Sequence, residues 1–223
     1  MSRRRPRPVV AAGLGLVVLA ALWAAGKAGA DVEPGHVTAA HQMNAAPRFG
    51  QFAADQPITE LLSGIDYAPS RDALDSVMGD AAADQLVAIA RGTRSDLDDA
   101  GMRIRAYQAL ALYAAPSIEV ALRAAVAEHG AVASGVDTLY LRAAMDSLAA
   151  VAPDTAVSAL APMLAHPSQD VRAGAARALG STGSDAVVPH LRARLQEEPV
   201  LQVRLAIADA LRRVDNASEG TVK

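Results

Sequence analysis

Apolar residues recur along this chain of 223 residues at the three- and four-residue spacing that is typical of amphipathic helices. One nine-residue pattern, in which arginine and alanines precede a leucine, is clearest at Val171–Leu179. It recurs at Val203–Leu211 and Met102–Leu110, with a more divergent copy at Tyr140–Leu148. Repetition of one helical pattern along the chain indicates a repeat architecture.

The leucines give a numerical test of this repeat. The leucines that close successive copies are Leu74, Leu110, Leu148, Leu179 and Leu211, at separations of 36, 38, 31 and 32 residues. Adding 12 to each of the first four numbers gives Leu86, Leu122, Leu160 and Leu191. A constant offset within each repeat, with variable lengths between repeats, predicts a row of helical hairpins.

The pattern also predicts where each helix lies. First helices are expected at 70–78, 101–114, 137–150, 169–179 and 200–214. Second helices are expected at 81–91, 117–129, 154–165 and 184–197. Adding 12 to Leu211 reaches Lys223, which leaves no room for a fifth second helix. We therefore expect about four and a half repeats, with a polar outer face on the last helix.

Residues that stop or start helices agree with this scheme. The residues expected to stop a helix between paired leucines are Gly79, Pro116, Pro153, Gly180 and Gly183. Asp154 and Ser184 stand where a side-chain oxygen could cap a helix N-terminus. Pro162 and Pro189 fall inside two second helices, which should therefore be kinked or start later.

Two windows carry a family resemblance. Asp170–Gly180 (DVRAGAARALG) and Ala186–Leu191 (AVVPHL) resemble the HEAT-like repeats of the phycobilisome lyase type, and the resemblance extends over residues 70–214. It implies an all-α fold, an α-solenoid of stacked antiparallel helix pairs, and a surface used for contact with a protein partner. The family also contains enzyme subunits and lyases. An accessory subunit or lyase-like enzyme acting on a cofactor or protein substrate is therefore the alternative.

Composition narrows the function further. Hydrophobic residues make up 52% of the chain, aromatic residues only 3%, and cysteine is absent. Five of the 21 basic residues lie in residues 1–30, so residues 31–223 hold 24 acidic against 16 basic residues, a net charge near −8. Nucleic-acid binding needs a cationic face, so we expect no nucleic-acid partner.

Residues 1–30 are expected to be a signal peptide or a membrane anchor. Arg3, Arg4 and Arg5 precede an apolar stretch at 9–26, and Ala28–Ala30 matches a small-x-small cleavage site. An uncleaved stretch of this length could attach the chain to a membrane. Both alternatives place the body outside the cytoplasm, in the periplasm or the extracellular space. An uncleaved segment would anchor it in the inner membrane.

The remaining chain divides into three parts. Residues 31–69 are rich in proline and glycine and are expected to be a tether, with a short helix near 57–65. Residues 70–215 are expected to form the repeat domain and residues 216–223 a tail.

Basic residues on the second helices are candidates for partner binding. The candidates are Arg123, His190, Arg192 and Arg194; the alternative is that they are merely solvated. Arg103, Arg172 and Arg204 share one repeat position, either as a basic row for an acidic partner or as internal links that pair with an acid such as Asp170 or with helix-end carbonyls.

No motif indicates catalysis. The chain contains no Gly-x-Ser-x-Gly, no phosphate-binding Gly-x-x-x-x-Gly-Lys motif and no His-Glu dipeptide. His129 and His166 end second helices, where histidine complements the helix dipole, and neither has the spacing of a metal ligand. The sequence therefore predicts a non-enzymatic scaffold with no metal, cofactor or catalytic residue.

Overall fold

The computed structural model describes residues 58–64, 68–131 and 135–220. The expected signal peptide or anchor, and most of the expected tether, lie outside these residues. Within the described residues, no helix is both long and apolar enough to cross a membrane. The described part of the chain consists of α-helices and short 3-10 helices, with no strands, as expected for an all-α fold.

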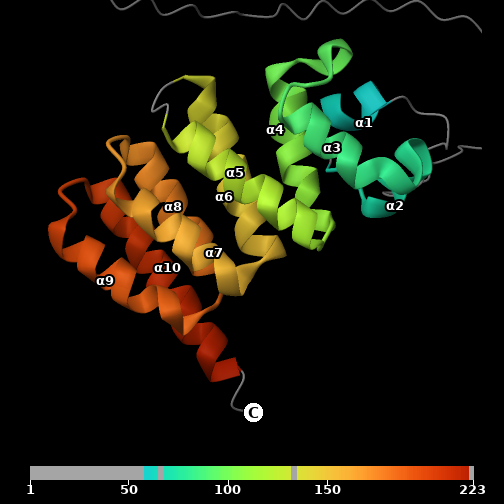
Figure 1. Cartoon of the computed structure of the whole chain (residues 1–223). Helices are drawn as coiled ribbons and strands as arrows, with labels where there is room; N and C mark the ends of the chain where they lie inside the picture. Colours follow the sequence, from blue (N-terminus) through green and yellow to red (C-terminus); the bar gives the residue numbers. More distant parts are fainter. Residues whose placement is uncertain (1–57, 65–67, 132–134, 221–223) are drawn as a thin grey trace, which may run out of the picture. The chain divides into compact units, whose positions relative to one another are not determined.

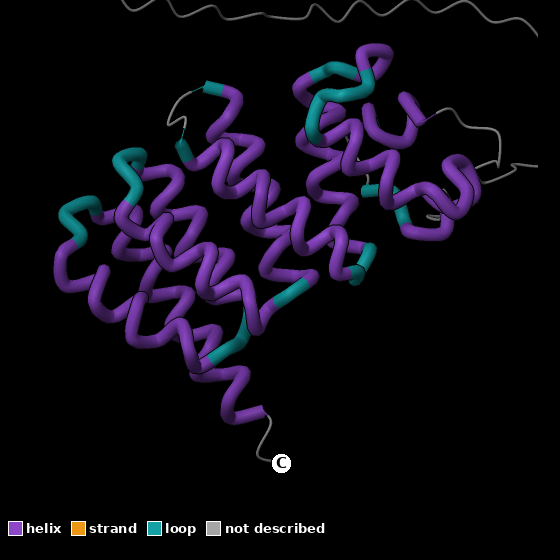
Figure 2. The backbone as a smooth tube through the Cα atoms, in the orientation of Figure 1, coloured by secondary structure: helices purple, strands orange, loops and turns teal. Residues whose placement is uncertain are grey.

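The helices follow one another as hairpins (Figures 1 and 2). Those of the first row are α1 (Ile58–Ser63), α4 (Ala100–Ala109), α6 (Val136–Val151), α8 (Gln169–Ser181) and α10 (Leu201–Gly220). Those of the second row are α3 (Ala82–Ala90), α5 (Pro116–Gly130), α7 (Pro153–Leu160) and α9 (Val188–Glu197). Helix α2 (Arg71–Met78) precedes α3. In the first row, α4 packs on α6, α6 on α8 and α8 on α10. In the second row, α5 packs on α7, and the 3-10 helix η4 (Ala161–Ala165), which follows α7, packs on α9.

The paired leucines form the middle of the core. Leu74, Leu110, Leu148 and Leu179, and the four leucines that lie 12 residues after them, are each at most 1% exposed. Burial of both members of every pair confirms the hairpin predicted from the constant offset. Leu211, the unpaired fifth, is only partly buried.

The first hairpin differs from the expected arrangement. Helix α1, rather than α2, packs against α4 as its preceding neighbour in the first row. Helix α2 packs on α1 and α3. Leu61 and Leu62 of α1 are buried in the core. Part of the expected tether therefore belongs to the repeat body and covers its first helix pair.

The expected stops and caps are mostly confirmed. Ser70 caps α2 by accepting a hydrogen bond from the Ala73 amide at 3.2 Å, and Gly79 ends that helix with a φ of 67°. The Ser184 hydroxyl accepts from the Ala186 amide at 3.3 Å. Asp154 is not a cap, because α7 begins one residue earlier at Pro153 and has Ala152 as its N-cap residue.

The two internal prolines act as predicted. Helix α7 ends at Leu160, and Pro162 lies in the 3-10 helix η4 (Ala161–Ala165) that continues it. Helix α9 starts later than 184, since η5 (Asp185–Val187) precedes it and Pro189 occupies its first turn. A first-turn proline costs no backbone hydrogen bond.

Gly180 was predicted to be a helix stopper, and this prediction is wrong. Gly180 lies inside α8, and Gly183, with a φ of 65°, makes the turn. A Cβ atom on Gly180 would lie 2.6 Å from the Cα and Cβ atoms of Ala210. The glycine therefore permits α8 and α10 to approach closely. Helix α10 also continues to Gly220, so most of the expected tail is helical.

Candidate functional site

The four predicted partner-binding residues separate into two kinds. Arg123 donates from its two Nη atoms to the Thr155 carbonyl at 2.8 Å and to the Ser158 hydroxyl at 2.9 Å, so it links α5 to α7. Arg194 donates to Glu198. His190 and Arg192 are exposed on α9. Of the four residues, only His190 and Arg192 have side chains without a hydrogen bond or ion pair to another described residue.

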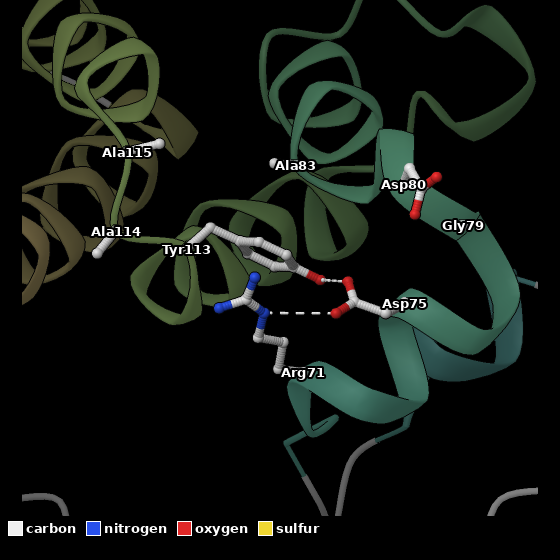
Figure 3. A pocket seen from close by; sticks show the side chains of 8 residues that line it. All are labelled: Arg71, Asp75, Gly79, Asp80, Ala83, Tyr113, Ala114 and Ala115. Atoms are coloured by element: carbon white, nitrogen blue, oxygen red, sulfur yellow. Dashed lines mark hydrogen bonds and ion pairs between the residues drawn. The ribbon is translucent and has the colours of Figure 1, made fainter.

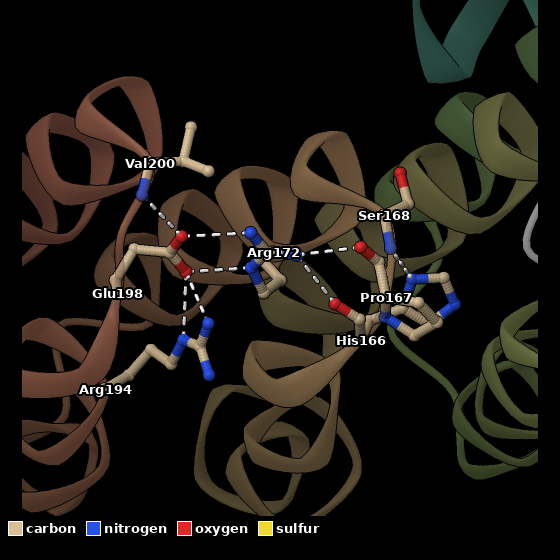
Figure 4. A network of polar contacts seen from close by, with 7 residues as sticks. All are labelled: His166, Pro167, Ser168, Arg172, Arg194, Glu198 and Val200. Atoms are coloured by element: carbon tan, nitrogen blue, oxygen red, sulfur yellow. Dashed lines mark hydrogen bonds and ion pairs between the residues drawn. The ribbon is translucent and has the colours of Figure 1, made fainter.

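A buried ion-pair network joins α8 to the end of α9 and to the connection that leads into α10 (Figure 4). The Glu198 side chain is fully buried and receives both Nε and Nη2 of Arg172, at 2.8 and 2.9 Å. Arg194 donates to one of its carboxylate oxygens at 2.7 and 2.9 Å. The Val200 amide donates to the other oxygen at 3.0 Å.

These donors determine the charge of Glu198. Hydrogen bonds from Arg172 and Arg194 lower the pKa of Glu198 to about 2, although burial alone would raise it. The hydrogen bonds to Glu198 likewise raise the pKa of Arg172. Arg172 also donates to the carbonyl oxygens of His166 and Pro167, both at 2.9 Å. Its guanidinium is therefore an internal link, and its acidic partner is Glu198 rather than Asp170.

Arg103 occupies the same repeat position and has a different role. Its Nε donates to the Ala90 carbonyl at the end of α3 at 3.1 Å, and its guanidinium lies over the Tyr140 ring, 4.4 Å from the centroid. Arg204, the third member, is exposed on α10. Two of the three arginines therefore link repeats internally, and a continuous basic row does not form.

A second buried polar group lies at the junction of α4, α5 and α6. His129 Nδ1 donates to the Asp137 carboxylate at 2.9 Å, and its Nε2 accepts from the Tyr107 hydroxyl at 3.1 Å. Its ring is 5.2 Å from that of Tyr140. The Ser147 hydroxyl donates to the Tyr107 carbonyl at 2.7 Å. Desolvation raises the pKa of Tyr107 to about 12, so the phenol is protonated at neutral pH.

His166 also serves the structure. Its Nδ1 accepts from the Ser168 amide at 3.1 Å, so its Nε2 carries the proton and donates to the Gly130 carbonyl at 3.2 Å. Both histidines thus use their two ring nitrogens within the chain. Within the described ranges, no group of three or more His, Cys, Asp or Glu side chains could hold a metal ion.

A hollow lies beside the first two hairpin turns (Figure 3). It has a volume of about 360 Å³. On one side it is lined by Arg71, Asp75 and Tyr113, and on the others by Gly79, Asp80, Ala83, Ala114 and Ala115. Its walls are mostly small side chains, which leave the space open.

The polar side of this hollow is preorganised. The Tyr113 hydroxyl donates to Asp75 at 2.7 Å, and Arg71 Nε donates to the other oxygen of the same carboxylate at 3.3 Å. The Arg71 guanidinium lies over the Tyr113 ring, 4.9 Å from its centroid. Burial and the hydrogen bond to Asp75 raise the pKa of Tyr113. Arg71 keeps its Nη groups at the pocket, and its side chain is 59% exposed.

A second hollow, of about 230 Å³, lies next to the first. The two share Ala114 and Ala115, and the second is also lined by Pro116, Glu119 and Val151. Together they form what we term the turn groove, which passes the inner turns of three successive hairpins. The sequence singled out none of its polar residues, because Arg71, Asp75 and Tyr113 belong to no motif and meet only after the hairpins stack.

Comparison with known proteins agrees with the fold. Residues 131–212 match a family described as HEAT repeats, which covers α6 to α10. A search of curated proteins and a search of solved structures each found no match. The family match supports HEAT repeats in general and does not extend to the phycobilisome lyase type.

Proposed function

Because the chain is a HEAT-repeat protein, we propose that it is an exported, non-catalytic scaffold that binds a segment of a partner protein in the turn groove. The observation that carries this proposal is that two neighbouring hollows share Ala114 and Ala115 in their linings. A groove past several turns suits an extended segment better than a compact small molecule. Repeat proteins bind in this way through surfaces that several units share.

The groove offers shape and a few fixed polar groups. Asp75 holds Arg71 and Tyr113 in place, so binding would cost little side-chain entropy on this side. The Nη groups of Arg71 can donate to backbone carbonyls of the bound segment. Because residues 31–223 carry a net charge near −8, by 16 basic against 24 acidic residues, a protein partner suits the chain better than nucleic acid.

The exposed basic residues of α9 extend this proposal. His190 and Arg192 are accessible and could form a second contact. Arg123 and Arg194 fit that role less well, because both are held by neighbours within the stack. Their replacement would alter the scaffold as well as any bound partner.

Filling the groove tests the binding proposal. In Ala114→Trp, an indole would occupy the point where the two hollows meet, since Ala114 is exposed and lines both. We expect recovery of a partner captured from envelope extract to fall at least tenfold, or about 1.4 kcal/mol. Ala124→Trp, at another exposed alanine on α5, is the matched control. Equal loss in both variants, or in neither, would contradict the groove assignment.

Export is proposed from residues 1–30, where four arginines precede an apolar stretch. Cell fractionation followed by N-terminal sequencing tests it. A mature chain beginning at Asp31 in the periplasm or medium supports a cleaved signal peptide. An intact chain in the membrane fraction supports an anchor, and an intact chain in the cytosol contradicts both.

A further inference from the structure

The first-row helices present equivalent residues to the next helix of the row. Positions are counted from the repeat leucine, and positions −7, −3 and 0 are compared between helices. They are Arg103 and Tyr107 on α4 with Leu110 directly after it, Leu141, Met145 and Leu148 on α6, and Arg172, Ala176 and Leu179 on α8. The Tyr107 ring lies 6.2 Å from the Tyr140 ring of α6, and the Tyr107 carbonyl accepts from the Ser147 hydroxyl of α6. Met145 Cε would lie 3.2 Å from a Cβ atom on Gly174 of α8. Arg172 is held by Glu198 just before α10. This face is therefore the one that the following helix covers.

On α10 the same face is open. Arg204 at position −7 is exposed, and Ala208 and Leu211 at positions −3 and 0 are only partly buried, whereas Ala176 and Leu179 on α8 are fully buried. Asp215, one turn after Leu211, is exposed on the same side. Among the described residues, α8 and α9 are the α-helices that pack on α10, and they leave this face uncovered.

Apolar side chains extend along the edge of this face. Leu201 and Leu205 are 68% and 60% exposed. They are four residues apart on α10, so their side chains lie on the same side of the helix. The last helix has the expected polar residues on its outer side, where Arg212 pairs with Asp209. Leu201 and Leu205 add an exposed apolar stripe that was not expected from the sequence. A helix with such a stripe buries it when another helix packs against it.

The charges on the face indicate which helix would fit. If two copies of α10 lie antiparallel around a twofold axis, residues whose numbers sum to 419 face each other. Arg204 then lies opposite Asp215 of the second copy, and Ala208 lies opposite Leu211 of the second copy. Each of these pairs occurs twice, so small residues face large ones and opposite charges meet. Neither Arg204 nor Asp215 has an ion pair within the described part of the chain.

We propose that this face of α10, defined by Arg204, Ala208, Leu211 and Asp215, is a twofold interface with a second copy of the chain. Such an interface is isologous, because each copy contributes the same residues. The apolar residues supply the burial. The two exposed ion pairs supply little energy, but they fix the register, since the wrong register places like charges together.

Charge exchange tests the proposal directly. The full chain, in a mild detergent that shields the apolar stretch at 9–26, is measured by light scattering on a sizing column over a range of concentrations. We expect a reversible dimer for the parent protein. Arg204→Glu and Asp215→Arg should each be at least tenfold weaker in association, because each places two like-charged pairs across the axis.

Mixing the two variants is the decisive measurement. A heterodimer of Arg204→Glu with Asp215→Arg contains two opposite-charge pairs again, so dimers should reappear in the mixture. Arg192→Glu makes the same charge change at an exposed residue of α9 and should dimerise like the parent. Circular dichroism checks that every variant keeps its helical content. A parent protein that stays monomeric, variants that dimerise like the parent, or a mixture that stays monomeric would each overturn the proposal.

Discussion

The junction of α8 with α10 and the junction of α4 with α6 solve the same packing problem with different chemistry. At the first, Arg172 meets the buried carboxylate of Glu198. At the second, Arg103 lies over the Tyr140 ring and bonds a helix-end carbonyl. At these two junctions the arginine of the shared repeat position is satisfied by different partners.

The difference should appear in how much each junction depends on one residue. The α8–α10 junction concentrates its polar contacts on a single carboxylate and its backbone packing on a single glycine. The α4–α6 junction spreads its contacts over aromatic rings, His129 and Ser147. We therefore expect single substitutions to be most damaging in the C-terminal half of the stack.

The largest effect is expected for Glu198→Ala. Removal of this carboxylate leaves the guanidinium of Arg172 buried without its counter-ion, and breaking a buried ion pair typically costs about 3–5 kcal/mol. Chemical denaturation of the variant and the parent measures this loss of unfolding free energy. Glu197→Ala, at the exposed neighbouring position, is the control and should change stability by less than about 0.5 kcal/mol. Equal losses at both positions would show that the network does not hold this junction.

The sequence was sufficient to predict the scaffold because its signals are local. The leucine offset, Pro162, Pro189 and Ser184 act through helix geometry within a few residues. It could not identify Glu198 as the partner of Arg172, because the two are 26 residues apart and meet only when α10 docks. Gly180 was misinterpreted for a similar reason. A glycine near a helix end looks the same in the sequence whether it ends the helix or allows a residue of another helix, here Ala210, to approach closely.

The turn groove was also beyond the reach of the sequence. Tyr113 and Asp75 lie 38 residues apart, on different hairpins, and the first hairpin departs from the regular repeat because α1 takes the place beside α4. Basic residues on second helices could be recognised from their positions. Whether each was free or engaged depended on neighbours in the next repeat, as the contact of Arg123 with α7 shows.

A smaller effect is expected for Gly180→Ala at the same junction. The new methyl group would lie 2.6 Å from Ala210, so α8 and α10 must move apart, and overpacking of this kind typically costs about 1–3 kcal/mol. Thermal unfolding measures the change. Gly174→Ala is the matched control on the same helix, because its Cβ atom would meet the flexible ends of Arg142 and Met145 at 3.2 Å instead of backbone. Partial recovery in Gly180→Ala with Ala210→Gly would confirm the close approach; a cost equal to that at Gly174 would contradict it.

The smallest effect is expected at the α4–α6 junction, for Tyr107→Phe. The substitution removes the hydroxyl that donates to His129 at 3.1 Å and leaves a buried ring nitrogen unpaired, which costs about 1–2 kcal/mol. His129 keeps its bond to Asp137 and its contact with Tyr140, so the junction retains most of its contacts. Denaturant unfolding compares this variant with Tyr140→Phe, because the Tyr140 ring contacts His129 but its hydroxyl does not bond to it. A loss for Tyr107→Phe as large as that for Glu198→Ala would show that both junctions depend equally on one residue, and the contrast between them would fail.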